Sequence, residues 1–186
     1  MFPTLETPRL LLRELGHADA DALLSIHGDA ETMRWFGADP IATREQALQL
    51  VEMFAGWRRQ PNPGTRWGLV RKSDRRLIGS AGLFKWNRSW RNAALGYELA
   101  RDCQGQGLMS EALRAVLGYG FGEMRLHRVQ AEIHPDNAAS RRLAERLGFR
   151  QEGLLRDSGY WGGRYHDLVC YGLLAGEWSP ALKDKQ

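Results

Sequence analysis

The chain has 186 residues, of which 43% are apolar and 26% are charged. This length suits one domain with one sizeable core, and the composition excludes an intrinsically disordered chain. No stretch approaches the roughly eighteen apolar residues of a membrane span, and the first ten residues have no apolar segment typical of a secretory signal. We therefore expect a single domain over residues 1–186, located in the cytoplasm.

The net charge of +4 and the pI near 9.3 mildly favour anionic partners, without identifying one. Cys103 and Cys170 follow no CxxC spacing, and the five histidines show no metal-ligand spacing such as HExxH. We therefore expect neither a disulfide framework nor a metal site. No Lys/Arg stripe or RNA-binding aromatic motif is present, so we expect no direct nucleic-acid role.

The spacing of apolar residues predicts the elements in chain order. They are a strand (9–15), a helix (18–27), a helix after Thr43, a hairpin (65–71 and 77–84), a strand (93–100), a helix after Gly107, a strand (128–134), a helix (138–147) and two strands (150–156 and 166–174). Thr43 and Gln46 fit a capping box. A Gly-rich loop is expected over 158–165. This order predicts an α+β fold with a mixed, mostly antiparallel sheet that contains one short parallel element.

A glycine loop after the strand over 93–100 carries the strongest functional signal. The strand runs into Gln104-Gly105-Gln106-Gly107, which opens the next helix. Glycines let the backbone turn its N–H groups toward one point, and a helix N-terminus adds partial positive charge, so the loop suits a pyrophosphate. A simple tight turn would give the same pattern, and at this point both interpretations remain open.

Two other phosphate-binding loops do not fit the chain. It has no GxxxxGK[ST] run, which disfavours a P-loop. The Rossmann pattern GxGxxG requires a third glycine where Ser110 stands, and it normally follows the first strand of a doubly wound sheet. Several antiparallel strands come first here. Nucleotide hydrolysis and hydride transfer are therefore weak interpretations.

Four segments in the right order resemble the GNAT N-acetyltransferases over nearly the whole chain. Gly96-Tyr97-Glu98-Leu99 followed by the glycine loop is similar to that family's acetyl-CoA loop, and 136–149 is similar to its NxxSxxxxxxxGF helix. Two further stretches, 7–13 and 152–156 followed by 163–167, resemble the RimJ/RimL-like branch, which includes acetyltransferases of ribosomal-protein N-termini. Asp102 departs from the Gln or Arg of many members. A carboxylate near a pyrophosphate is unfavourable, so we expect Asp102 to point away.

The resemblance implies a GNAT fold with a core over about 7–178, in which the strands over 93–100 and 128–134 are parallel and splay apart. It implies acetyl-CoA as co-substrate and no metal. The pantetheine arm would lie between these strands, against backbone groups of Leu99 and Ala100. The residues expected to bind the pyrophosphate open the next helix: Gln104, Gly105, Gln106, Gly107, Leu108, Met109 and Ser110.

Acetyl transfer needs an unprotonated amine, because an ammonium ion has no lone pair. A general base helps, since amine pKa values lie at about 8 to 10. The resemblance suggests Glu132 as this base, and Glu98 on the neighbouring strand is the second candidate; either could act through water. A carboxylate paired with a nearby arginine is the structural alternative for each residue.

The departing thiolate has a pKa near that of cysteine, about 8.5, and needs little help from an acid. Many GNAT enzymes use a tyrosine four residues after the serine of the Asn–Ser helix, but this chain has Ala144 there. Ser140 is the surviving hydroxyl and resembles the serine proposed as acid in the RimL-like branch. Asn137 would hydrogen-bond the pantetheine or simply cap its helix. No histidine is positioned by sequence to activate Cys103, so direct transfer is favoured over an acyl-cysteine.

Aromatic residues are expected at the acceptor mouth: Trp35, Phe36, Trp161 and Tyr165. The leading hypothesis is an acetyl-CoA-dependent N-acetyltransferase that acts on a primary amine, first of all the N-terminal α-amine of a ribosomal-type protein. The alternatives are acetylation of a small amine, an amino-acid-like metabolite or an antibiotic, and a CoA-binding sensor without turnover. An RNA-binding module is the competing class. We expect a monomer or homodimer without a membrane partner.

Overall fold

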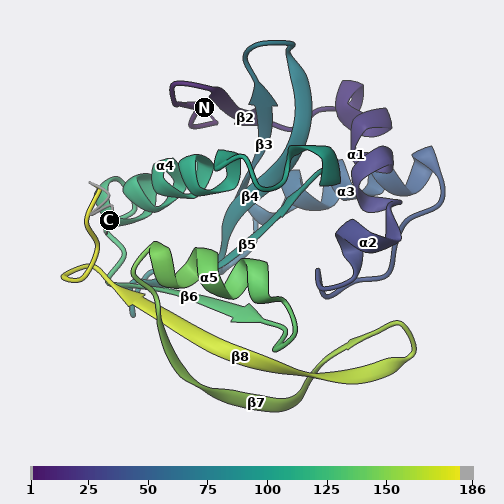
Figure 1. The fold of residues 1–186 in the computed structure, drawn as a ribbon. Helices are drawn as coiled ribbons and strands as arrows, with labels where there is room; N and C mark the ends of the chain where they lie inside the picture. Colours follow the sequence, from purple (N-terminus) through teal and green to yellow (C-terminus); the bar gives the residue numbers. More distant parts are fainter. Residues whose placement is uncertain (1, 181–186) are drawn as a thin grey trace.

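An eight-stranded mixed sheet runs through the centre of the chain (Figure 1). The structure is a computed structural model that describes residues 2–180. The strand order is β1-β2-β3-β4-β5-β6-β8-β7, and every neighbouring pair is antiparallel except β5 and β6. The strands are β1 (Leu5–Glu6), β2 (Leu10–Glu14), β3 (Thr65–Arg71), β4 (Arg76–Asn87), β5 (Asn92–Leu99), β6 (Arg128–Ile133), β7 (Arg150–Trp161) and β8 (Arg164–Leu174). The predicted α+β fold with one parallel pair is confirmed.

Helices cover both faces of the sheet. They are α1 (Ala20–His27), α2 (Ala30–Met33), α3 (Arg44–Trp57), α4 (Leu108–Gly122) and α5 (Ala138–Arg146). Neighbouring strand residues point to opposite faces. Accordingly, Val70 and Leu77 belong to one core cluster with α1 and α3, whereas Leu69 and Ile78 belong to another with α4 and α5. None of the helices within residues 2–180 is long and apolar enough to cross a membrane.

The predicted capping box begins α3. The Thr43 hydroxyl accepts a hydrogen bond from the Gln46 backbone N–H at 3.3 Å, and the Gln46 side chain accepts one from the Thr43 N–H at 3.1 Å. These reciprocal bonds satisfy amides that an α-helix otherwise leaves unpaired at its start. The sequence prediction of a helix after Thr43 is confirmed.

The segment predicted as a loop over 158–165 is instead the end of a β-hairpin. Strands β7 and β8 pair up to Trp161 and Arg164, so only Gly162 and Gly163 form the turn. Both glycines have positive φ, at 59° and 73°. A two-residue turn with two left-handed residues matches the twist of a hairpin, and glycine adopts that conformation without strain. The hairpin extends beyond the rest of the sheet (Figure 1).

Strands β5 and β6 pair over a short distance and then separate. Their parallel register runs from Asn92 opposite Arg128 to Ala94 opposite Gln130. Beyond this point, residues 95–99 of β5 pair only with β4, and residues 131–133 of β6 pair only with β8. The facing edges of these two segments are therefore free to bind an extended ligand. This is the splayed parallel pair that the resemblance implied.

Candidate active site

A cleft of about 730 Å³ occupies the opening between β5 and β6. One end lies at the glycine loop and the start of α4, and the other lies at the residues that follow α2. The start of α5 forms a third side. The lining residues are Glu31, Thr32, Trp35, Phe36, 95–99, Cys103, Gln104, Gly105, 107–110, 131–133, Asn137, Ala139, Ser140, Arg142, Leu143 and Arg146.

The glycine loop presents unpaired backbone amides to the cleft. Gly105 and Gly107 have φ values of 74° and 75°, a left-handed conformation that favours glycine. Within the described chain, the N–H groups of residues 105–110 make no hydrogen bond; the first bond of α4 runs from the Glu111 N–H to the Gly107 carbonyl. Together with the partial positive charge of the helix start, these amides form an anion-binding site.

Side chains around the loop hold its shape. The Gln104 side-chain amide donates to the Leu99 carbonyl at 3.0 Å, and the Arg9 guanidinium donates to the Gln106 carbonyl at 2.9 Å. The Gln106 side chain donates to the Asp102 carbonyl at 2.9 Å. Ala100 and Gln106, both predicted to bind the co-substrate, are not among the residues that line the cleft; Ala100 is buried, and its N–H donates to the Ile78 carbonyl.

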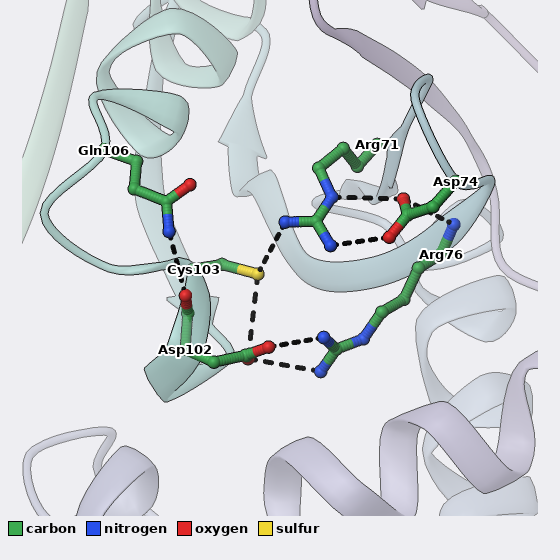
Figure 2. Close-up of polar contacts among 6 residues, drawn as sticks. All are labelled: Arg71, Asp74, Arg76, Asp102, Cys103 and Gln106. Carbon is green, nitrogen blue, oxygen red and sulfur yellow. Dashed lines mark hydrogen bonds and ion pairs between the residues drawn. The ribbon is translucent and has the colours of Figure 1, made fainter.

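Asp102 is directed away from the glycine loop, as expected. Its carboxylate forms an ion pair with Arg76 on the β3–β4 hairpin, with one contact at 3.2 Å (Figure 2). On the same hairpin, Arg71 binds Asp74 through two hydrogen bonds of 3.0 and 2.6 Å. The carboxylate nearest the loop in sequence is therefore neutralised by an arginine, outside the cleft.

Cys103 lies between these two ion pairs and is not an activated thiol. Its sulfur is 3.6 Å from the Arg71 guanidinium and 3.7 Å from Asp102 (Figure 2). Burial raises the pKa of the Cys103 thiol, and the Asp102 carboxylate raises it further. A nucleophilic cysteine requires the opposite shift. This environment of Cys103 supports direct transfer of the acetyl group rather than an acyl-cysteine intermediate.

Glu98 is buried in a network that joins β3, β4, β5 and α1. One oxygen of the Glu98 carboxylate accepts a hydrogen bond from the Arg66 guanidinium. The other oxygen accepts one from the Ser80 hydroxyl at 2.5 Å and lies 3.2 Å from His27 Nε2. Burial by itself would raise the pKa of Glu98, but the Arg66 charge and the bonds from His27 and Ser80 lower it to about 2. Glu98 therefore stays ionised, with both oxygens engaged.

Glu132 differs from Glu98 in every one of these respects. It is exposed on β6 and lines the cleft. Within residues 2–180, no ion pair or side-chain hydrogen bond engages its carboxylate. Both oxygens can therefore accept a proton, directly or through water.

The start of α5 brings Asn137 and Ser140 to the cleft. The Asn137 carbonyl oxygen accepts from the Ser140 backbone N–H at 3.1 Å, so Asn137 caps the helix. Its NH₂ group faces no partner within the described chain and can donate to a ligand, so the two predicted roles are compatible. Ala144, one turn further, is buried in the core.

Trp35 and Phe36 line the acceptor end, and other side chains hold them there. The Phe36 ring packs edge-on to His27 at 5.2 Å between centroids, and the Arg66 guanidinium lies over it at 5.5 Å. The Trp35 ring stacks on His134 at 4.2 Å. The buried network of Glu98 thus supports Phe36.

Trp161 and Tyr165 do not line the cleft. Trp161 is buried, its ring stacks on His166 at 3.7 Å, and its indole N–H donates to the Arg34 carbonyl at 3.2 Å. Trp161 therefore packs behind the acceptor wall, which is formed by Trp35 and Phe36. Tyr165 is 66% exposed at the end of the hairpin and packs edge-on against Tyr160.

His134 and His166 connect the hairpin to the acceptor wall through hydrogen bonds of fixed direction. The Asp136 backbone N–H donates to His134 Nδ1 at 3.1 Å, so that nitrogen carries no proton. His134 Nε2–H then donates to His166 Nδ1 at 3.3 Å, and His166 Nε2–H donates to the Trp161 carbonyl at 3.1 Å. All three bonds require both imidazoles to be neutral. Burial correspondingly lowers the pKa of His134.

Comparison with known proteins agrees with this geometry. Residues 9–150 match the family model of the acetyltransferase (GNAT) domain. The chain belongs to the GNAT acetyltransferase family. It is 36% identical over 174 residues to the uncharacterized N-acetyltransferase YoaA of Bacillus subtilis, which covers 94% of this chain and 98% of the relative. It is 35% identical over 115 residues to the [ribosomal protein uS5]-alanine N-acetyltransferase of Escherichia coli, covering 61% of this chain and 59% of that enzyme.

A solved structure shows the same GNAT fold. The GNAT-family acetyltransferase from Bacillus anthracis superposes with a TM-score of 0.82 at 26% identity, over 94% of this chain and 100% of the other. Acetyl-CoA is the acetyl donor of the family, and the cleft fits it: the unpaired amides suit its pyrophosphate, and the free strand edges suit its extended arm. No group of three His, Cys, Asp or Glu side chains placed to hold a metal occurs within residues 2–180.

Sequence reasoning missed two arginines on the GNAT helix that follows the splayed strand. Arg142 and Arg146 are exposed, line the cleft and lie four residues apart, so they share one face of α5. Neither takes part in an ion pair in the described part of the chain. They are suited to phosphate groups. The spacing of the two arginines was the signal that could have revealed them.

Proposed function

We propose that this N-acetyltransferase moves the acetyl group of acetyl-CoA directly onto the N-terminal α-amine of a protein. The observation that carries the proposal is the 35% identity to the E. coli [ribosomal protein uS5]-alanine N-acetyltransferase. The open end of the cleft supports it, since the unpaired carboxylate of Glu132 attracts a cationic N-terminus and Trp35 and Phe36 offer apolar contact to the first residues.

In this proposal, Glu132 is the general base. Its carboxylate is exposed to the cleft and unpaired, whereas both oxygens of Glu98 are occupied by Arg66, Ser80 and His27. A group that takes a proton must have a free lone pair directed at the proton or at a bridging water. Glu98 instead holds Arg66, which supports Phe36. Its role in the reaction is therefore one of positioning.

The donor side is assigned to backbone groups and short polar side chains. The amides of residues 105–110 receive the pyrophosphate, Arg142 and Arg146 add positive charge, and the Asn137 NH₂ group donates to the pantetheine. Ser140 directs a hydroxyl at the departing sulfur. The amine nitrogen bonds to the acetyl carbon, and the carbon–sulfur bond breaks with its electron pair on sulfur. Glu132 takes the proton lost by nitrogen, directly or through water, and releases it to solvent, from which the thiolate is protonated.

A panel of acceptors tests the proposal. Thiol release from acetyl-CoA is measured with short peptides that differ in their first residue, their Nα-blocked counterparts, spermidine, an aminoglycoside and free amino acids. We expect release with free N-termini and none with the blocked peptides. Efficient acetylation of a small amine without acetylation of peptides would overturn the peptide assignment. Absence of release with every amine would favour a CoA-binding sensor.

Glu132→Gln tests the base. We expect turnover at neutral pH to fall by about ten- to a hundredfold and to recover in part at high pH, where the amine is already unprotonated. The melting temperature should not change, because Glu132 is exposed and unpaired. Full activity of this variant at neutral pH would remove the assignment.

Ser140→Ala tests the hydroxyl. A donor to the departing sulfur predicts a lower saturated rate, by at most about tenfold to a hundredfold because a thiolate leaves readily, with similar CoA affinity. If Ser140 only positions the pantetheine, CoA affinity falls while the saturated rate stays the same. One preparation is measured for rate, CoA affinity and melting temperature.

A further inference from the structure

Tyr97 carries a buried hydroxyl that the site described so far does not use. The residue lies on β5, three positions after Ala94, the last β5 residue that pairs with β6. Its side chain therefore belongs to the splayed segment, and it lines the cleft. The hydroxyl oxygen is enclosed by protein and makes no hydrogen bond within residues 2–180. Buried polar groups are nearly always paired, so an unpaired one requires an explanation.

Besides burial, the groups that shift the pKa of the Tyr97 hydroxyl are Ser140 and Tyr171. The Tyr171 hydroxyl is already engaged: it accepts from the Arg141 guanidinium at 3.1 Å and donates to Glu145 at 3.3 Å. The Ser140 hydroxyl has no hydrogen bond in the described chain, and it lines the same cleft. Burial raises the pKa of Tyr97, so its hydroxyl keeps its proton and acts as a donor at neutral pH.

We propose that Tyr97 positions Ser140 for catalysis by donating a hydrogen bond to its hydroxyl oxygen when the acetyl donor is bound. The bond directs the Ser140 proton toward the departing sulfur. A hydroxyl that accepts a hydrogen bond is also a stronger donor, because the two bonds polarise each other. Tyr97 thereby compensates for Ala144, which offers no hydroxyl on the next turn of α5.

This assignment rests on the proposed role of Ser140 and adds no proton to the reaction. Both hydroxyls keep their protons while the carbon–sulfur bond breaks and its electron pair stays on sulfur. The negative charge that develops on sulfur is met by the Ser140 O–H, and the Ser140 oxygen is met by the Tyr97 O–H. Tyr97 is a positioning residue, because it acts through Ser140.

The first test compares Tyr97 with Tyr171 by conservative substitution. In Tyr97→Phe the unpaired hydroxyl is removed, so the melting temperature of the ligand-free protein should stay the same or rise, while the saturated rate falls about tenfold. Tyr171→Phe is the matched control: it loses the bonds to Arg141 and Glu145, so its melting temperature should fall and its saturated rate should not. A Tyr97→Phe protein that melts lower, with an unchanged rate, would overturn the proposal.

The second test asks whether Tyr97 acts through Ser140. We expect Tyr97→Phe to lower the rate in the wild-type background and to have no further effect in the Ser140→Ala background. Independent losses that multiply in the double variant would contradict the proposal.

A third measurement does not depend on any acceptor. The thiol of bound CoA is titrated by its ultraviolet absorbance, and we expect its pKa to rise in Tyr97→Phe and in Ser140→Ala, and no further in the double variant. An unchanged pKa in Tyr97→Phe would overturn the proposal. If no acceptor in the panel reacts, the proposed function fails, and this titration still decides the role of Tyr97.

Discussion

The two ends of the cleft differ in whether backbone groups or side chains form them. The glycine-loop end offers backbone N–H groups from one continuous segment, residues 105–110. The acceptor end consists of side chains, and each of these is held by residues from other elements: Phe36 by His27 and Arg66, and Trp35 by His134.

This difference explains what each end can tolerate. Backbone amides are supplied by any sequence that keeps the turn, so the donor end depends on its glycines and on the few side chains that hold the loop. The acceptor end depends on buried polar contacts, and a buried polar group that loses its partner is costly. We therefore expect substitutions behind the acceptor wall to change stability and acceptor binding, and substitutions in the loop to change CoA affinity.

The largest expected effect is that of Glu98→Gln. This change leaves the buried Arg66 charge without its anion, and breaking a buried ion pair in this way costs about 3–5 kcal/mol of unfolding free energy. Urea unfolding at neutral pH measures it. Glu132→Gln is the matched control, because an exposed, unpaired carboxylate should change the free energy by less than about 0.5 kcal/mol. Equal stabilities of the two variants would contradict the assignment of a structural role to Glu98.

The second effect concerns the donor end. In Gly107→Val, a β-branched residue must adopt a φ of 75°, which costs about 1–3 kcal/mol and displaces the amides of the loop. We expect the CoA dissociation constant, measured by calorimetry, to rise at least about tenfold, in line with that strain. Gly118→Ala, further along α4, places its Cβ in open space and should change the affinity by no more than about twofold. A folded Gly107→Val protein with unchanged CoA affinity would remove the phosphate-loop assignment.

A substitution behind the acceptor wall should leave the binding of the acetyl donor unchanged. His166→Phe keeps a ring against Trp161 but leaves His134 Nε2–H unpaired, at a cost of about 1–3 kcal/mol. We expect a lower melting temperature and a higher acceptor KM with the amine that the wild type accepts, and unchanged CoA affinity. The neighbouring exposed change Tyr165→Phe should affect none of the three. A parallel loss of CoA affinity in His166→Phe would show that the two ends are not separable.

The smallest expected effect is a pH dependence of stability from His134. Burial, His166 and Arg164 lower its pKa, and the carboxylates of Asp136 and Asp167 oppose them only in part. Because the unfolded chain binds this proton more readily, the stabilising contribution is present at neutral pH and is lost as pH falls below about 6.5. The melting temperature should therefore fall between about pH 7.5 and about pH 5.5.

Two variants assign this loss to His134. His134→Asn should show a smaller fall of melting temperature over the same pH range. His17→Gln, which removes an exposed histidine from its pair with Glu52, should behave as the wild type does. An unchanged pH dependence in His134→Asn would contradict the assignment.

The difference between the two ends of the cleft also determines how much of the fold and of the site could be predicted from the sequence. Thr43 with Gln46, the hairpin around Ser73 and the glycine loop are local signals, and the structure contains each of them. The acceptor wall depends on contacts between distant residues: Arg66 and Glu98 are 32 positions apart, and Trp161 and Arg34 are 127 apart. No local spacing encodes such pairs. For the same reason, Trp161 was expected at the acceptor mouth, whereas the structure places it behind the wall.

The short seam between β5 and β6 has a consequence for the dynamics of the chain. Within residues 2–180, the pairing of β5 with β6 covers only residues 92–94 and 128–130, extended by hydrogen bonds from the His127 and Arg128 N–H groups to the Arg91 carbonyl. This short pairing joins the part of the sheet made of β1–β5 to the part made of β6–β8. A ligand that fills the opening and hydrogen-bonds both edges acts as an additional strand and couples the two parts. Amide hydrogens of residues 95–99 and 131–133 should then exchange with solvent more slowly when CoA is bound, and the two halves should unfold as one cooperative unit.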